Sequence, residues 1–355
     1  MTNRVSDMRK FWSVKPYRKL GRAFNFIIGG RGVGKTFNSI YESNYVYDEK
    51  IILMRRTQTE IDLITSHGED VELSPFAKIN ERSHQKKYGL IPTNYHIGRV
   101  NEKIYGIYDG EKEEKKYLGM ILALSTVASI RGFSAVDIST MIYDEFIPEK
   151  HVKKIGKGTA EADAFFNAYE TINRDREESG EKPIQVFLLS NANDLNCPLL
   201  SELGFDTIFE KMRRKKIPFI DLPQRNATLT LYEDREFKEA KRKTALYQLT
   251  KGTKFYDMAL ENDFSFNDFS LIKSMPLSEF NPWCIYGDVC IYRHKSVYLF
   301  YVSPHIMSCD FYDITKQDTQ RFVIERGRFL YGAFIEGAVI FENFHVKMKI
   351  LELIG

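Results

Sequence analysis

The chain has 355 residues, 43% hydrophobic and 28% charged, with a formal net charge of +3. This composition is typical of a folded protein of about two domains. The net charge is too small to indicate a nucleic-acid partner, so such a surface must come from local basic clusters. The four cysteines form no C-x-x-C pair, which argues against a zinc site and favours reduced thiols. We find no apolar run of membrane-spanning length and no signal core in residues 1–19, and expect a cytosolic protein without a membrane partner.

The first 22 residues mix basic residues with the aromatic residues Phe11, Trp12 and Tyr17. Two interpretations stay open for this segment. Its aromatic side chains either pack on the domain that follows, or they contribute to a nucleotide-base pocket or a nucleic-acid contact.

A phosphate-binding loop follows the short apolar run at residues 24–28. Residues 29–36, called the phosphate loop below, fit the pattern G-x-x-x-x-G-K-[ST] and consist of Gly29, Gly30, Arg31, Gly32, Val33, Gly34, Lys35 and Thr36. Glycines let successive backbone N–H groups point at phosphate oxygens, and the next helix directs its positive end at the same anion. We predict that the loop binds ATP, that Lys35 reaches the β- and γ-phosphates in binding and catalysis, and that the Thr36 hydroxyl ligates Mg²⁺. Arg31 either senses the γ-phosphate or points at solvent.

A second apolar strand, residues 50–54, ends in Arg55 and Arg56. Either one guanidinium lies near the phosphates or both belong to a solvated loop, and the pattern does not decide between the two. Residues 71–98 are polar and irregular, and we interpret them as an insertion. Residues 103–108 and 116–124 flank the turn signal Asp109-Gly110 and predict a hairpin.

Adjacent carboxylates close the mostly apolar strand at residues 138–145. Downstream of a phosphate loop, Asp144 is expected to hold Mg²⁺ and Glu145 to polarise an attacking water. A helix is predicted at residues 159–176, and its end carries Arg174, which by pattern alone complements the helix dipole. The strand at residues 184–189 leads into residues 190–193, where Asn191 either senses the γ-phosphate or belongs to an asparagine-rich turn.

These elements predict an α/β fold, a P-loop NTPase of the additional-strand (ASCE) type with a central, mostly parallel sheet. In this order the motifs resemble the DNA-packaging (encapsidation) motor ATPases of phi29-like tailed bacteriophages, within the large-terminase superfamily. The resemblance covers residues 24–195. It rests on the phosphate loop, on Arg55-Arg56, on residues 129–132 ahead of Asp144-Glu145, and on residues 190–193, where the family has its coupling motif.

The resemblance implies a homo-oligomeric ring, a pentamer in phi29-like phages, docked on a portal (connector) protein. The ring hydrolyses ATP to move double-stranded DNA into a procapsid, and some phi29-like motors also use a packaging RNA. The resemblance also implies that the protein lies in the host cytoplasm, transiently at the portal vertex and not in the mature virion. In such rings an arginine from one subunit completes the neighbour's site. Arg174 is the first candidate for this role, ahead of Arg131 and Arg176.

The second half of the chain carries two basic clusters, residues 211–216 and residues 238–251, either of which suits phosphate contacts or a solvated helix. We predict an ATPase domain at residues 1–197, a linker or small helical element at 198–228, and a smaller α+β, ribonuclease H-like domain at 229–355. The resemblance implies that this last domain is a vestigial nuclease. Its carboxylates lack recognisable spacing, namely Asp288, Asp310, Asp313, Glu336 and Glu342. Two alternatives stay open: a cutting terminase with an active metal-dependent nuclease, and a nucleotide-switched DNA-binding regulator.

Overall fold

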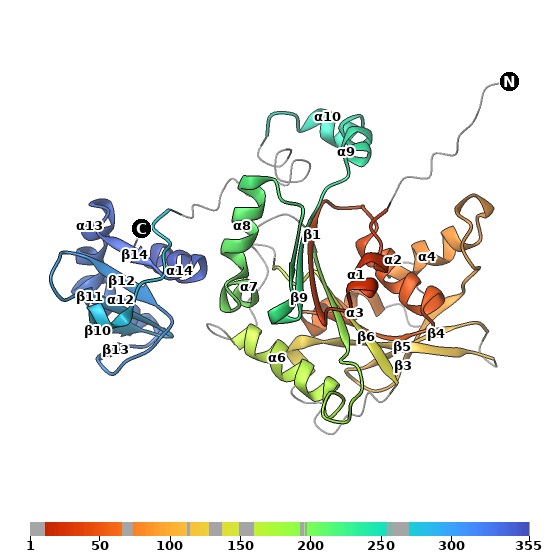
Figure 1. Cartoon of the computed structure of the whole chain (residues 1–355), viewed down its shortest axis with the longest axis horizontal. Coiled ribbons are helices and arrows are strands. Elements are labelled where there is room, and N and C mark those ends of the chain that lie inside the picture. The colour runs from red at the N-terminus through yellow and green to blue at the C-terminus, as the bar shows by residue number, and fades with distance from the viewer. Residues whose placement is uncertain are drawn as a thin grey trace. The chain divides into compact units, whose positions relative to one another are not determined.

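The computed structural model describes residues 11–65, 74–111, 114–127, 137–148, 160–191, 195, 197–253, 256 and 270–354 (Figure 1). The chain divides into two compact units. The first comprises Met1–Ile155, Asp163–Asn193 and Lys215–Phe264, and the second comprises Gly156–Ala162, Asp194–Arg214 and Ser265–Gly355.

The first unit is built on a nine-stranded sheet in the order β3-β4-β5-β2-β6-β7-β1-β9-β8. Its six central strands run parallel; they are β5 (Lys116–Ala123), β2 (Lys50–Arg55), β6 (Ile138–Asp144), β7 (Gln185–Asn191), β1 (Phe24–Gly29) and β9 (Ala227–Tyr232). Each of the three outer strands is antiparallel to its inner neighbour; they are β3 (Tyr95–Arg99), β4 (Tyr105–Asp109) and β8 (Phe219–Leu222). β7 lies between the phosphate-loop strand β1 and the carboxylate strand β6, so the predicted additional-strand arrangement is confirmed.

Both faces of this sheet are covered, which explains why its central strands are almost continuously apolar. On one face, a core that includes Ile27, Leu53 and Phe187 packs against the helices α1 (Lys15–Leu20), α2 (Lys35–Tyr41), α3 (Gln58–Thr65) and α4 (Pro75–Ser83). On the other face, Phe165 of α6 (Ala160–Asn173) stacks on Tyr143 of β6 with ring centroids 5.7 Å apart. The remaining helical elements of this unit are η1 (Glu42–Val46), η2 (Lys86–Tyr88), α5 (Leu124–Val127), η3 (Pro223–Arg225), α9 (Arg235–Arg242) and α10 (Ala245–Leu249).

Two sequence-based expectations differ from this architecture. The expected insertion at residues 71–98 contains α4 and β3, which supply Phe76, Ile79 and Tyr95 to the buried core. The predicted domain boundaries at residues 197 and 228 also differ from the division into two units, in which Asp194–Arg214 belongs to the second unit and Lys215–Phe264 to the first. The boundary at 228 falls inside β9, which pairs in parallel with β1 and belongs to the large sheet. β9 reads as a short strand rich in threonine. Only its pairing with a strand about 200 residues earlier identifies it as part of this unit.

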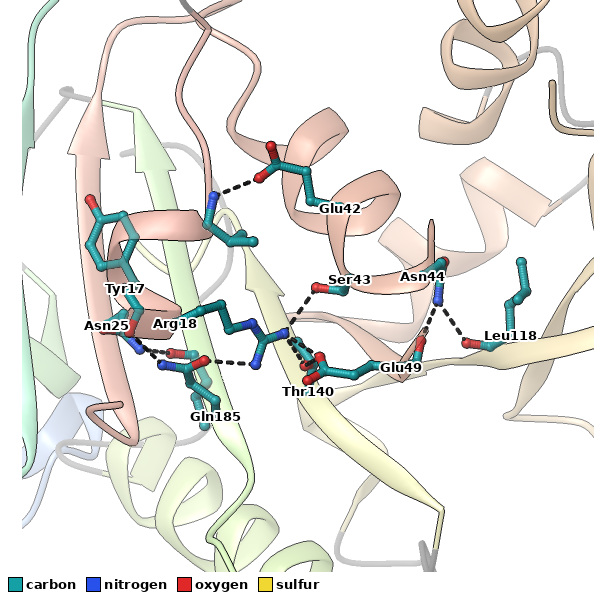
Figure 2. Close-up of polar contacts among 12 residues, drawn as sticks. Tyr17, Arg18, Asn25, Glu42, Ser43, Asn44, Glu49, Leu118, Thr140 and Gln185 are labelled. Atoms are coloured by element: carbon teal, nitrogen blue, oxygen red, sulfur yellow. Dashed lines mark hydrogen bonds and ion pairs between the residues drawn. The ribbon is translucent and has the colours of Figure 1, made fainter. Parts of the chain in front are cut away.

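A buried polar network joins α1 to the beginning of the parallel strands, at the edge opposite the phosphate loop (Figure 2). The two Nη atoms of Arg18 donate to Gln185 Oε1 at 2.7 Å and to Thr140 Oγ1 at 2.6 Å. Arg18 also pairs with Glu49. Burial lowers the pKa of Arg18, and Glu49 opposes that shift. Arg18 therefore connects β6 and β7 through hydrogen bonds that hydrophobic side chains cannot replace.

Arg18→Met should destabilise the first unit by about 2–3 kcal/mol, because it leaves Glu49 without its partner at a site mostly closed to water. Urea unfolding followed by circular dichroism measures the loss. Lys19→Met on the same helix is the control, since Lys19 is exposed. Equal losses in the two variants would show that the network contributes nothing specific.

The second unit holds a five-stranded sheet in the order β13-β10-β11-β12-β14. Three strands form an antiparallel meander, β10 (Phe280–Tyr286), β11 (Val289–His294) and β12 (Phe300–Ser303). β13 (Asp310–Tyr312) runs parallel to β10, and β14 (Val339–Phe341) runs parallel to β12. The helical elements are α7 (Pro198–Glu202), α8 (Phe205–Lys215), η4 (Leu277–Glu279), α12 (Lys316–Phe322), η5 (Val323–Gly327), α13 (Arg328–Ile335) and α14 (Phe344–Ile354). Its assignment as ribonuclease H-like stays a prediction.

Candidate active site

The phosphate loop connects β1 to α2 and has a backbone that requires glycine. Gly32 and Gly34 adopt φ values of +85° and +87°, in the left-handed region that side chains disfavour. A Cβ atom at Gly34 would also lie 3.1 Å from the Cβ of Phe11. The loop is therefore shaped for backbone N–H groups to surround an anion, which supports the predicted phosphate site.

Lys35 is 7% exposed and lies at the first turn of α2. Its Nζ donates to the carbonyl oxygens of Gly29 at 2.8 Å and Gly30 at 3.0 Å, and to Asn191 Oδ1 at 3.3 Å. Burial lowers the pKa of Lys35 to about 8. An anion beside this ammonium would offset that burial, so the group is suited to receive a phosphate. Asn191, at the end of β7, lies at the same point.

The Thr36 hydroxyl and the Asp144 carboxylate meet across the site. Thr36 Oγ1 donates to Asp144 Oδ1 at 2.9 Å, although the two residues are 108 positions apart in the chain. Asp144 ends β6 and is only 4% exposed. A hydroxyl and a carboxylate oxygen are the hard ligands that Mg²⁺ takes beside nucleotide phosphates. The predicted magnesium ligands therefore fit the ion.

Arg55 bridges both carboxylates from the end of β2. One Nη atom lies 2.9 Å from Asp144 Oδ2 and the other lies 2.9 Å from Glu145 Oε2. Burial opposes the charge of Arg55, but Asp144 and Glu145 outweigh it and raise its pKa. Glu145, the candidate for polarising the attacking water, has a φ of +58°, an unusual value for a non-glycine residue. The sequence pattern left Arg55 and Arg56 unresolved; Arg55 enters the site, whereas Arg56 is 2% exposed in the interior.

Lys35, Thr36, Asp144, Glu145 and Asn191 line one pocket of about 450 Å³. Its walls come from the phosphate loop, from α2, from α4 and from the ends of β6 and β7; they are Arg31, Gly32, Gly34, Lys35, Thr36, Phe37, Pro75, Lys78, Arg82, Asp144, Glu145, Ser190 and Asn191. The predicted site residues of the phosphate loop, the carboxylate strand and the sensor strand are thus brought together. The contribution of α4 was missed because residues 71–98 were interpreted as an insertion, although Ser74 followed by Pro75 is a helix-start signal.

The predicted arginines for a neighbour's site lie elsewhere. Arg174 follows the last turn of α6, is exposed and has a φ of +39°. Close to it, Arg176 Nη2 donates to the carbonyl of Ile138, the first residue of β6, at 2.6 Å. Because β6 ends at Asp144, Arg174 lies toward the opposite edge of the sheet from its own phosphate loop. Arg131 lies outside the described residues, as do residues 129–132 and 192–193.

The N-terminal aromatic residues were expected either to pack on the domain or to contribute to a nucleotide-base pocket or a nucleic-acid contact. Trp12 and Tyr17 are 2% and 5% exposed and pack with Phe187, as expected for an arm that completes the core. The backbone N–H of Trp12 also donates to the carbonyl of Val33 in the phosphate loop at 3.0 Å. Phe11, by contrast, lies beside Gly34 at the pocket.

Some side chains of the two basic clusters form ion pairs, hydrogen bonds or ring contacts with other residues of the chain. In residues 211–216, Arg213 and Arg214 pair with Glu210 at 2.9 and 2.7 Å. In residues 238–251, Lys241 on α9 donates to the carbonyl of Arg31 and lies over the ring of Phe237. Part of the second cluster therefore supports the phosphate loop. Lys211, Lys215, Lys216, Lys243 and Lys251 remain exposed.

The scattered carboxylates of the second unit do not converge. Asp288 lies in the turn between β10 and β11 and pairs with Lys349. Asp310 pairs with Arg326 at 2.8 Å, and Glu342 accepts from the hydroxyl of Tyr301 at 2.9 Å. Across the described parts of both units, no group of three or more His, Cys, Asp or Glu residues is placed to hold a metal ion. Within those parts, no helix is long and apolar enough to cross a membrane.

The fold and this site define a P-loop NTPase of the additional-strand type, with the carboxylates Asp144 and Glu145 at the end of β6, the strand beyond β7. The chain belongs to the Podovirus DNA encapsidation protein (Gp16) family, whose model matches residues 111–352. This confirms the resemblance inferred from the motifs.

The chain is also similar to curated relatives in sequence and to solved structures in fold. The DNA packaging proteins of Bacillus phages phi29 and PZA are each 25% identical over 261 residues, which cover 73% of this chain and 67% of the relative. In fold, the chain is similar to the Phi-28 gp11 DNA packaging motor, with a TM-score of 0.57, 16% identity and 97% of each chain covered. It is also similar to the bacteriophage Phi-29 genome packaging motor assembly, with a TM-score of 0.55 and 23% identity over 97% of this chain and 98% of that one.

Proposed function

We propose that this protein hydrolyses ATP to drive double-stranded phage DNA into a procapsid. The observation that carries the proposal is the convergence of Lys35, the Thr36–Asp144 pair and Glu145 on one pocket, in a chain of the DNA encapsidation family. A phosphate loop alone would support only nucleotide binding. The neighbouring carboxylates are what hydrolysis requires.

Each residue of the pocket has a separate role in the proposed hydrolysis. Lys35 exchanges the carbonyls of Gly29 and Gly30 for phosphate oxygens of the substrate, and Asn191 lies where it can sense the γ-phosphate. Glu145 orients the attacking water and accepts its proton. Thr36 and Asp144 would hold Mg²⁺, which when bound would neutralise charge on the phosphates. Arg55 orients both carboxylates from the neighbouring strand.

The proposed partners follow from the family. They are double-stranded DNA, a portal (connector) protein and, as in some phi29-like motors, a packaging RNA. The protein would act as a homo-oligomeric ring, a pentamer in phi29-like phages, in the host cytoplasm and transiently at the portal vertex. Exposed lysines of the two basic clusters supply phosphate contacts for DNA.

Stimulation of ATP hydrolysis by double-stranded DNA tests the proposal. We expect the turnover of purified protein to rise in the presence of linear duplex, and the rise to shrink as salt increases, because phosphate contacts release counterions. A turnover rate independent of DNA at low salt would instead favour a nucleotide-switched binder.

We also propose that the second unit is a vestigial domain without nuclease activity. The support is the engagement of Asp288, Asp310 and Glu342 by separate partners instead of a shared metal site. Cleavage of supercoiled DNA in Mg²⁺ or Mn²⁺, lost in Asp288→Ala, would contradict this and favour a cutting terminase.

Arg174 is proposed to complete the site of a neighbouring subunit, since it lies far from its own phosphate loop. Arg174→Ala should lower turnover, and mixing it with Glu145→Gln protein should restore part of the activity. In mixed rings some intact sites would receive Arg174 from the Glu145→Gln neighbour. The steady-state rate as a function of mixing ratio measures this. A rate that never exceeds the sum of the two separate proteins would exclude a role in the neighbour's site.

A further inference from the structure

The pocket is lined by Asp144, Glu145 and Asn191 and also by residues that the proposed hydrolysis does not use, namely Phe37, Pro75, Lys78 and Arg82. Lys35 and the loop are proposed to hold the β- and γ-phosphates near the carboxylates. Phe37 directly follows Thr36 on α2, and α4 supplies the other three residues. This part of the pocket is therefore where the nucleoside of a bound triphosphate can lie.

Among the described residues, Arg82 on α4 contacts three aromatic rings. Its Cζ lies 5.5 Å from the ring centroids of Phe11 and Phe37 and 5.4 Å from that of Tyr88. Within the same described part of the chain, its side chain makes no ion pair with a carboxylate and no hydrogen bond. Arg82 is half-buried and lines the pocket. Its N–H donors therefore have no acceptor among the described residues.

The chemistry of this group selects an aromatic ligand. Guanidinium planes stack on aromatic faces, and the attraction grows when water is excluded. A purine base entering beyond Phe37 adds one more aromatic face to the same cation. We propose that Arg82, held in place by Phe11, Phe37 and Tyr88, stacks on the purine base of the nucleoside triphosphate. This inference rests on the proposed function, because it takes the ligand of the phosphate loop to be ATP.

ATP and inorganic tripolyphosphate test the assignment, because both carry a triphosphate but only ATP carries a nucleoside. Dissociation constants for ATP and for inorganic tripolyphosphate, both with Mg²⁺, are measured by calorimetry on the full chain. Arg82→Met keeps a long side chain against the aromatic rings and removes the cation. We expect it to weaken ATP binding about tenfold and tripolyphosphate binding less than twofold. Arg99→Met, an exposed arginine outside the pocket, should change neither.

The other outcomes overturn the inference. Equal weakening of ATP and tripolyphosphate would mean that Arg82 binds phosphate, and no change in either would mean that it binds nothing. If Arg82→Met fails to fold, Phe37→Leu replaces it, since loosening the aromatic support should also weaken ATP selectively. If the wild-type protein binds ATP but the variants leave the ratio of the dissociation constants for ATP and tripolyphosphate unchanged, this inference alone is wrong. No ATP binding by the wild-type protein would overturn the proposed function together with it.

Discussion

Glu145→Gln should bind ATP within a few fold of the wild-type affinity and hydrolyse it about 10²–10⁴ times more slowly. The amide keeps the shape of the side chain and a hydrogen bond to water, but it cannot accept the proton of the attacking water. Asp144, Thr36 and Lys35, which are proposed to make the magnesium and phosphate contacts, are left in place. Phosphate release under saturating ATP measures the rate, and calorimetry measures the binding.

Glu102→Gln is the matched control for this prediction, because Glu102 is exposed in the loop between β3 and β4. It removes the same charge far from the pocket and should leave turnover unchanged. A Glu145→Gln protein that keeps more than about a tenth of the wild-type rate would show that another group accepts the proton. Loss of ATP binding together with the rate would instead make Glu145 a residue of the binding site.

Arg55→Met should lower kcat by about 10–100-fold and change the KM for ATP much less. Arg55 is the cation that holds Asp144 and Glu145 side by side, each at 2.9 Å. Without it the two carboxylates repel one another, and Glu145, whose side chain is 54% exposed, is free to leave its orientation. A displacement of about 1 Å in a catalytic group costs about two orders of magnitude in rate.

Arg55→Lys distinguishes this positioning role from simple charge. A lysine supplies one ammonium and cannot contact both carboxylates in the planar geometry of a guanidinium, so we expect little rescue of kcat. Arg99→Met is again the control. An unchanged kcat in Arg55→Met, in protein that melts at the wild-type temperature, would contradict the positioning role. Full rescue by Arg55→Lys would show that charge alone is needed.

Those parts of the site that depend on local sequence were predictable. The phosphate loop is a run of eight residues whose glycines, lysine and threonine each have a stated chemical role. The carboxylates Asp144 and Glu145 come directly after an apolar strand, so their place at a strand end follows from the strand itself. The fold class followed from the order of such segments, and the additional strand β7 lies where that order required it.

Those parts that depend on contacts between distant segments were not predictable. Arg55 and Arg56 look alike in the sequence, and only the pairing of β2 with β6 decides that Arg55 meets the carboxylates. In the polar stretch at residues 71–98, Ser74 followed by Pro75 marks the start of α4, but no local pattern says that this helix lines a pocket formed by other segments. The predicted boundary at residue 228 falls inside β9, whose place in the large sheet likewise depends on pairing with the distant β1.

The amino-acid sequence by itself determined that this protein has a phosphate loop, a pair of adjacent carboxylates at a strand end and a parallel α/β sheet to carry them. These properties are local, since each is set by residues that neighbour one another along the chain. The tertiary structure alone decided which arginine bridges the carboxylates, which helix lines the pocket beside Phe37 and which strands complete the sheet. Each of these depends on the register between strands that are far apart in sequence, and no short pattern encodes that register.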